Sequence, residues 1–390
     1  MNPETNKGRM SPFGVTQSHL QRLSTLIVGL SVVATLLGSR RVLSDWDFFA
    51  GISKLLFGSE GLQVYGNHVK IQSGPLSLIV IRVLSLSWLD HIVVRTIAFG
   101  AIELVAISWV RRTRTLSGLD QRGLDTCLVI GALVTAFWWT QLKIYGHIDD
   151  ALVIMIYTAS LYLVIAGRRV SPAILVGLAI AVKPWAVFLL PLTMDRDARG
   201  VRKFRWPMVS AAVAGVCWAP FILATSRTLD GMRPVVKVAR DSVVHLVGFD
   251  DQSIPSWVRL VQFVSAILVA TVAVWRGRYA GVLFAGIGVR LVTDPATWDY
   301  YTAGFIFGAL VWDLCATNRR VPVFTLLTAS LMMPSWVVAN PDLRALLRLV
   351  ACLVAISVVS APLRRRSEME ATAAQPTDQC SESLQPLAVG

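Results

Sequence analysis

The stretch Ser44-Asp45-Trp46-Asp47-Phe48-Phe49 follows the first long apolar run of the chain, residues 23–38. It places two carboxylates at the mouth of a hydrophobic region. An ionised side chain there costs at least ~2.5–3.5 kcal/mol, so it usually faces a cavity or a polar partner. Asp45 and Asp47 could also be solvated loop residues that pair with Arg40 and Arg41. Which interpretation holds depends on what the rest of the chain places beside them.

The composition identifies an integral membrane protein. The 390 residues are 54% hydrophobic and only 16% charged, and the mean hydropathy is +0.59, whereas soluble domains carry roughly 25% charged residues. Only helices and closed barrels satisfy their own backbone hydrogen bonds in lipid. Because a helical span takes about 20 residues, we expect an all-α polytopic protein with about 11–12 transmembrane helices, including a short half-helix hairpin.

The charge pattern marks topology and argues against a nucleic-acid partner. The net charge is +13, but the basic residues lie in short clusters between apolar runs, as expected for cytoplasmic loops. No basic patch with interleaved aromatic residues supports RNA or DNA binding. The five cysteines are scattered, and no pair has the spacing of metal ligands or of a disulfide framework.

The apolar runs define one membrane domain with two polar tails. Residues 1–20 and 367–390 are predicted to be disordered cytoplasmic tails. Residues 21–366 are predicted to form a single polytopic transmembrane domain. Within it, residues 40–90 are expected to form a structured first extracytoplasmic loop.

Two amphipathic segments are predicted inside this loop. A helix over residues 45–57 would carry Phe48, Phe49, Ile52, Leu55 and Leu56 on one face. The sequence Gly74-Pro75-Leu76 then opens an apolar segment that ends near residue 86. This segment is too short to span a bilayer comfortably, and its length suits an interfacial or re-entrant helix.

A half-helix hairpin is predicted where the chain has little room to cross and return. Residues 170–194 lie between two basic clusters, Arg168-Arg169 and residues 195–205, which are both expected on the cytoplasmic side. Because proline cannot continue a helix, Pro184 marks the turn and leaves Lys183 at its tip. Half-helices of this kind are tolerated only where they line a cavity.

Counting crossings between the basic clusters predicts a multi-pass plasma-membrane protein with both termini cytoplasmic. A set of polar residues then falls at the extracytoplasmic face: Asp45, Asp47, Lys143, Tyr145, His147, Asp149, Asp150, Lys183, Arg290, Asp294, Asp299 and Tyr300. Acidic, basic and aromatic groups at one mouth are typical of a site for a polar substrate. Structural alternatives stay open, namely an interfacial aromatic belt, helix caps and snorkelling cations.

The sequence resembles the GT-C superfamily of polyprenyl-phosphate-sugar-dependent glycosyltransferases. It is most similar to glycosyltransferase family 87, the mannosyltransferase-like membrane enzymes of actinobacteria. The likeness rests on Asp45-Trp46-Asp47-Phe48-Phe49 with Gly58 and Tyr65, on Gly74-Pro75-Leu76, on Tyr145-Gly146-His147-Ile148-Asp149, on Gly177-Leu178-Ala179 with Lys183-Pro184-Trp185, and on residues 294–301. The chain departs from the family pattern where Phe49 replaces a tyrosine, Gly74 a proline, and His147 and Asp149 a glutamine and an asparagine.

The resemblance implies transfer of a hexosyl group, mannosyl by analogy, from a polyprenyl-phosphate-sugar donor. The acceptor would be a glycolipid, glycan or protein at the extracytoplasmic face. Asp45 would take the acceptor proton, with Asp47 as the alternative, and Lys183 and Arg290 would bind the donor phosphate. The remaining candidates would bind sugar or acceptor: His147, Asp149, Tyr145, Trp185, Asp294 and Tyr300. The acidic residues could also hold Mg²⁺ or Mn²⁺, although none has a defined ligand spacing.

Two other classes of function remain open at this stage. A secondary transporter of a sugar or an anionic substrate would also use half-helices and intramembrane charges. Its polar residues would be expected at both faces, however, and here they gather at one. A membrane scaffold or lipid-binding protein without chemistry is the third possibility.

Overall fold

The computed structural model describes residues 44–87, 91–119, 123–232, 236–249, 254–334 and 337–362, together with the single positions Gly29 and Val33. These residues form α-helices and 3₁₀-helices, and no β-strand occurs among them. The prediction of an all-α protein is therefore confirmed for this part of the chain. Apart from Gly29 and Val33, the predicted first span, residues 23–38, lies outside it, and so do both predicted tails.

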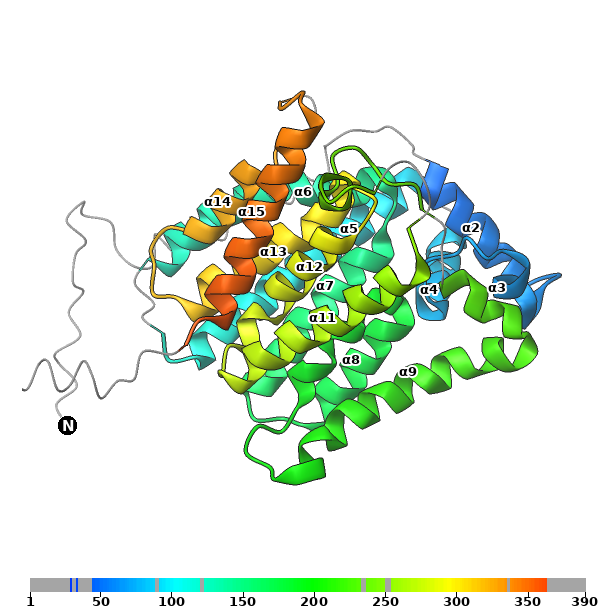
Figure 1. Ribbon diagram of the computed structural model, residues 1–390. Helices are drawn as coiled ribbons and strands as arrows, with labels where there is room; N and C mark the ends of the chain where they lie inside the picture. Colours follow the sequence, from blue (N-terminus) through cyan, green and yellow to red (C-terminus); the bar gives the residue numbers. More distant parts are fainter. Residues whose placement is uncertain are drawn as a thin grey trace, which may run out of the picture. The chain divides into compact units, whose positions relative to one another are not determined.

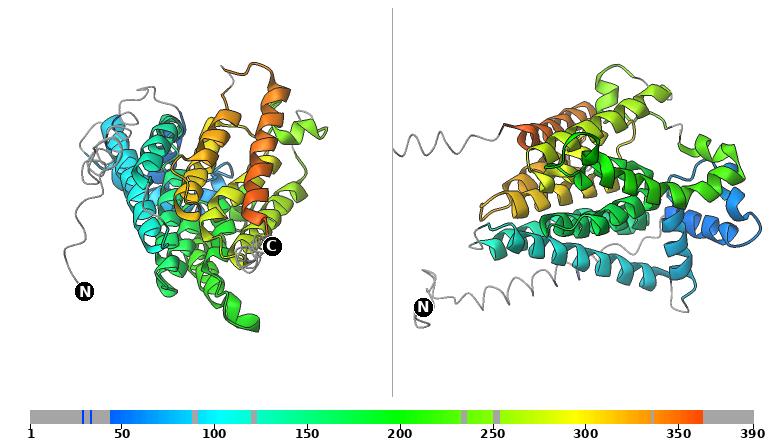
Figure 2. Two further views of the ribbon diagram at one scale, coloured as in Figure 1. Left: turned by 90° about the vertical axis from the view of Figure 1, so that its left-hand side faces the viewer. Right: turned by 90° about the horizontal axis from the view of Figure 1, so that it is seen from below.

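Six of the described helices are long and apolar enough to cross a membrane, which supports a polytopic membrane protein. They fall in α5 (His91–Leu116), α6 (Leu124–Tyr145), α7 (Ile148–Ile165), α9 (Arg205–Ala224), α11 (Ser256–Trp275) and α15 (Pro341–Ser360). Figures 1 and 2 show these helices packed side by side within the unit Met1–Ser360. The other apolar runs in the described part of the chain form shorter or more polar helices.

The centre of this unit is α13 (Asp299–Ala316), which packs against α6 and α12 (Val282–Thr293). Every residue from Tyr300 to Cys315 is buried, as expected for a helix that is covered on all sides. It carries two aspartates and is not among the six candidate spans. α13 is thus a core helix with protein, rather than lipid, around it.

The helix after α13 is short. It is α14 (Val323–Leu331), and the carboxylate of Asp313 accepts hydrogen bonds from the backbone N–H groups of Phe324 and Thr325 at 3.3 and 2.8 Å. This side chain supplies acceptors that the first turn of a helix lacks. The helix ends before Pro334, which cannot continue it.

The predicted hairpin is present, but its second arm is not an α-helix. The first arm is α8 (Val170–Val182), Lys183 is extended, and the second arm is the 3₁₀-helix η2 (Pro184–Thr193). Pro184 and Pro191 lack the backbone N–H groups that an α-helix would use. Arg169 Nη2 lies 3.8 Å from Asp195 Oδ1, so the chain returns to the level at which it entered.

The loop over residues 40–90 is structured as expected in its described part. It contains α2 (Ser44–Leu56), η1 (Gly61–Gln63), α3 (Val64–Asn67) and the short α4 (Pro75–Ser85). The amphipathic face of α2 is correct for Phe49 and Ile52, which are buried, and wrong for Phe48, which is 42% exposed. Trp46 is buried instead, because residues three apart share a helix face and adjacent residues do not.

Gly74 docks the start of α4 directly onto the hairpin tip. Its N–H donates to the carbonyl of Val182 at 2.8 Å, and a Cβ at this position would lie 2.1 Å from the carbonyl oxygen of Ala181. We therefore expect Gly74→Ala to destabilise the protein by about 1–3 kcal/mol, because backbone atoms must move apart. Thermal unfolding of the purified protein measures this change.

Gly51→Ala is the matched control for that substitution. Gly51 is exposed in the middle of α2, and nothing lies within 4 Å of an added Cβ. Alanine there should stabilise the helix by roughly 0.5–1 kcal/mol. Equal melting temperatures for Gly74→Ala and the wild type would contradict the close approach at Gly74.

Candidate functional site

The site begins at the sharp turn between α6 and α7. Gly146 ends α6 in the left-handed region, with φ of 76°, and a Cβ there would lie 2.9 Å from the backbone nitrogen of Trp46. Glycine is the residue that accepts this conformation without strain. The turn brings His147 to the start of α7 and sets Asp149 and Asp150 in its first turn.

Lys183 reaches these two aspartates from the hairpin tip. Its Nζ lies 2.6 Å from Asp149 Oδ2 and 3.1 Å from Asp150 Oδ2. All three side chains are buried. Burial disfavours the ammonium, but the two carboxylates outweigh it and hold the pKa of Lys183 above its ordinary value. The structure therefore assembles a buried lysine–dicarboxylate cluster from three residues that the charge pattern predicts to lie at one face.

His147 connects this cluster to Asp45 at the start of α2. Its Nε2 lies 3.2 Å from Asp45 Oδ2 and its Nδ1 lies 3.3 Å from Asp149 Oδ1. Burial and the Lys183 ammonium act against protonation, but the hydrogen bonds to Asp149 and Asp45 raise the pKa of His147 overall. Since both ring nitrogens face carboxylates, the imidazolium form donates to both.

Asp45 and His147 occupy different environments. The Asp45 side chain is 42% exposed, whereas that of His147 is 6% exposed. The ring of Tyr300 stacks on His147 at 3.7 Å with an interplanar angle of 16°, and Tyr145 packs on Tyr300 at 5.2 Å. The imidazole thus packs against Tyr300, which Tyr145 supports in turn, while the Asp45 carboxylate stays accessible.

Three further side chains complete the hydrogen bonding of the cluster. Ser73 Oγ donates to Asp149 Oδ2, and Trp185 Nε1 donates to Asp150 Oδ1 at 2.8 Å. The hydroxyl of Tyr65 donates to the carbonyl of Ser73 at 2.9 Å. Buried charges persist where their remaining lone pairs are satisfied in this way.

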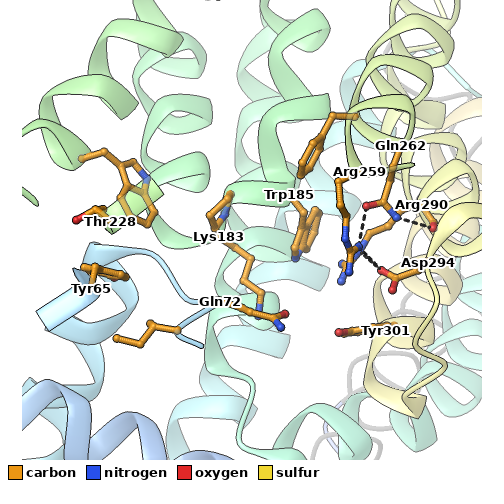
Figure 3. Close-up of a pocket in the computed structure, with 14 residues that line it drawn as sticks. Tyr65, Gln72, Lys183, Trp185, Thr228, Arg259, Gln262, Arg290, Asp294 and Tyr301 are labelled. Atoms are coloured by element: carbon orange, nitrogen blue, oxygen red, sulfur yellow. Dashed lines mark hydrogen bonds and ion pairs between the residues drawn. The ribbon is translucent and has the colours of Figure 1, made fainter. Parts of the chain in front are cut away.

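A cleft opens beside Lys183 (Figure 3), with about 670 Å³ of empty space when its open mouth is included. Lys183 and Trp185 lie between Tyr65 and Thr228 on one side and Arg259, Arg290 and Asp294 on the other. The rest of the lining is Tyr65, Ile71, Gln72, Pro184, Trp218, Thr228, Gln262, Phe263 and Tyr301. The cleft thus combines three cations with five aromatic side chains.

The two arginines of the cleft are held by one carboxylate and by aromatic rings. Asp294 Oδ2 lies 3.4 Å from Arg290 Nε and 3.5 Å from Arg259 Nη1. The guanidinium of Arg290 lies 4.4 Å from the ring centroid of Tyr301 and 5.1 Å from that of Trp185. Such contacts fix the guanidinium groups at the surface of the cleft.

The geometry of the cluster bears on whether it could hold a divalent cation. His147, Asp149 and Asp150 each offer a ligand atom, and these atoms lie within 4.8 Å of one another. The ammonium of Lys183 already lies between the two carboxylates. The donor set as arranged therefore fits a lysine better than Mg²⁺ or Mn²⁺.

Most of the candidate residues predicted from sequence come together at this place. Asp45, His147, Asp149 and Lys183 form one chain of contacts, and Trp185, Arg290, Asp294, Tyr145 and Tyr300 surround it. Asp47 differs, because it is exposed on α2 while Trp46 beside it is buried.

Three contributors were missed by the sequence reasoning: Ser73, Arg259 and Gln262. Arg259 lies in the first turn of an apolar helix, α11. A charge within a span is itself a signal of function, so this residue could have been found. Gln262, one turn further, accepts from Arg259 Nη1 at 3.0 Å and donates to the carbonyl of Arg290 at 3.0 Å.

Comparison with protein-family models gave no match, and comparison with curated protein sequences gave none either.

Proposed function

We propose that this protein transfers a hexosyl group from a polyprenyl-phosphate-sugar donor to an acceptor hydroxyl at the extracytoplasmic face of the membrane. One observation carries the proposal. A cleft lined by Lys183, Arg259 and Arg290 adjoins a cluster that ends in the accessible carboxylate of Asp45. A phosphate-binding surface next to a proton acceptor is the arrangement that such a transfer needs.

The surroundings of the cleft favour a phosphate that is attached to lipid. Trp218 on α9 and Phe263 on α11 line it together with the cations. Both helices are apolar, and only a minority of the residues in their most apolar windows are buried. If Lys183 binds the phosphate of a lipid, the apolar chain of that lipid can therefore lie between α9 and α11, which face hydrocarbon.

The reaction would be a displacement at the anomeric carbon. The bond from this carbon to the phosphate oxygen breaks with its electron pair, and a bond to the acceptor oxygen forms. Asp45 would take the acceptor proton as that bond forms, with His147 orienting its carboxylate. Lys183, Arg259 and Arg290 would stabilise the charge on the departing phosphate because they are already in place.

The extracytoplasmic side is proposed from the distribution of basic residues. At the end of the bundle away from the cluster, Arg114 Nη1 donates to the carbonyl of Thr317 at 3.0 Å. Arg278 Nη1 likewise donates to the carbonyl of Val359 at 3.2 Å. Arg114 and Arg278 belong to basic clusters that are predicted to be cytoplasmic. They contact the ends of neighbouring helices, and the chain there also carries basic residues, as the positive-inside rule expects.

A transporter is the second candidate, because Lys183 lies at a break between two short helices. Discontinuous helices with a charge at the break are typical of transport sites. Proteoliposomes loaded with protein would accumulate a labelled sugar or phosphate in that case. Transfer without such accumulation favours the enzyme.

The assay for the proposal uses purified protein in nanodiscs with radiolabelled polyprenyl-phosphate mannose. A lipid extract from a strain that lacks the gene supplies the acceptor. We expect a new labelled glycolipid, competition by unlabelled polyprenyl phosphate, and no competition by inorganic phosphate at equal concentration. If the label stays on the donor with this acceptor, and also with purified glycan and peptide acceptors, the result contradicts the proposed transfer.

A further inference from the structure

The polar cluster has the ligand set of a metal site, but a side chain of the protein occupies it. One nitrogen of His147 and oxygens of Asp149 and Asp150 lie within 4.8 Å of one another. The ammonium of Lys183 lies 2.6 and 3.1 Å from the two carboxylates and 3.5 Å from His147 Nδ1. All four side chains are buried.

The charges and the hydrogen bonds both act against a metal ion beside this lysine. An ammonium is a compact charge with three donors, and two of them are satisfied by Asp149 and Asp150. A divalent ion next to it would meet a like charge at short range. A metal also needs a free lone pair on His147, whereas Nε2 faces Asp45 and Lys183 Nζ already lies 3.5 Å from Nδ1.

We propose that Lys183 is the resident cation of this cluster and takes the place that a divalent metal would otherwise hold. The protein then binds no Mg²⁺ or Mn²⁺ among His147, Asp149 and Asp150. Lys183 also lines the cleft, so the same ammonium neutralises the carboxylates and faces the substrate. The inference concerns the cation at the site and does not require that the reaction be sugar transfer.

The test measures Mn²⁺ binding by electron paramagnetic resonance on chelator-treated protein. Wild type and Asp149→Asn should take up the same amount of Mn²⁺. Lys183→Ala should gain one site at least tenfold tighter than any in the wild type, because two buried carboxylates lose their counter-ion. The gain should disappear in Lys183→Ala/Asp149→Asn. Lys54→Ala, at an exposed position of α2, should resemble the wild type.

Thermal unfolding provides a second measurement. Because a ligand that binds only the folded state stabilises it, Mn²⁺ should raise the melting temperature of Lys183→Ala by at least about 3 °C. The same Mn²⁺ concentration should leave the wild type unchanged. A shift in the wild type that Asp149→Asn removes would overturn the proposal.

Two further results would also overturn it. One is a stoichiometric Mn²⁺ site in the wild type that depends on Asp149. The other is folded Lys183→Ala with no added site. If Lys183→Ala does not fold, the wild-type and Asp149→Asn measurements still decide the question. An Asp149-dependent Mn²⁺ site in the wild type would refute this inference and leave the proposed function intact, whereas an absence of transfer leaves the Mn²⁺ result unaffected.

Discussion

Asp45→Asn is expected to lower kcat for sugar transfer about 10²–10⁴-fold, which is the usual contribution of a general base. The amide has the shape of the carboxylate, and its oxygen can still accept the hydrogen bond that His147 Nε2 makes to Asp45 across 3.2 Å. The substitution therefore removes the ability to take a proton while it preserves the geometry. Initial rates at saturating donor and acceptor measure the change.

Asp47→Asn is the control, because it alters the same charge two residues away. Asp47 is exposed on α2, and we expect its substitution to change kcat less than twofold. Unchanged donor affinity in both variants would show that the donor cleft is intact. A large loss in Asp47→Asn together with normal turnover in Asp45→Asn would exchange the two assignments.

The convergence of the site was predictable from the sequence because charge clusters fix the parity of the crossings. Once the basic clusters are placed on one side, Asp45, His147, Lys183 and Arg290 must fall at the opposite ends of their segments. Only residues 170–194 separate two basic clusters that are placed on the same side, so the chain must turn back between them. The Arg169–Asp195 ion pair confirms this turn. Long apolar segments make this kind of inference robust.

The details of contact were not predictable, because they depend on tertiary packing. Hydrophobic pattern alone favoured Phe48 over Trp46, but Gly146 packs against Trp46 and fixes which face of α2 is buried. Ser73 has no sequence signature, since its role follows from the docking of Gly74 on Val182. The pairing of Arg259 with Asp294 joins the first turn of α11 to the end of α12, 35 residues later, and no local sequence pattern specifies that contact.

The second large effect is expected on folding. Lys183→Met should lower the free energy of unfolding by about 3–5 kcal/mol, the cost of leaving buried charge without its partner. Methionine fills a similar volume, so the loss reflects the carboxylates of Asp149 and Asp150 rather than a cavity. Trp185 and Ser73 still donate to them, but neither supplies a full charge. Unfolding in mixed micelles measures the difference, and Lys54→Met, at an exposed position, should change stability by less than ~0.5 kcal/mol.

The pH dependence and a double variant separate this electrostatic cause from a packing defect. Because the carboxylates hold the pKa of Lys183 above its ordinary value, its contribution is present below about pH 10 and is lost only as the pH rises through the raised pKa. The difference between wild type and Lys183→Met should therefore persist at about pH 9, and a change in it at lower pH reports His147, whose protonation Lys183 opposes. Adding Asp149→Asn to Lys183→Met should restore part of the stability, since it removes one unpaired charge. If the double variant is less stable than Lys183→Met, the lysine stabilises the protein through its packing. The ion pair then explains neither the stability of the fold nor the cation at this position.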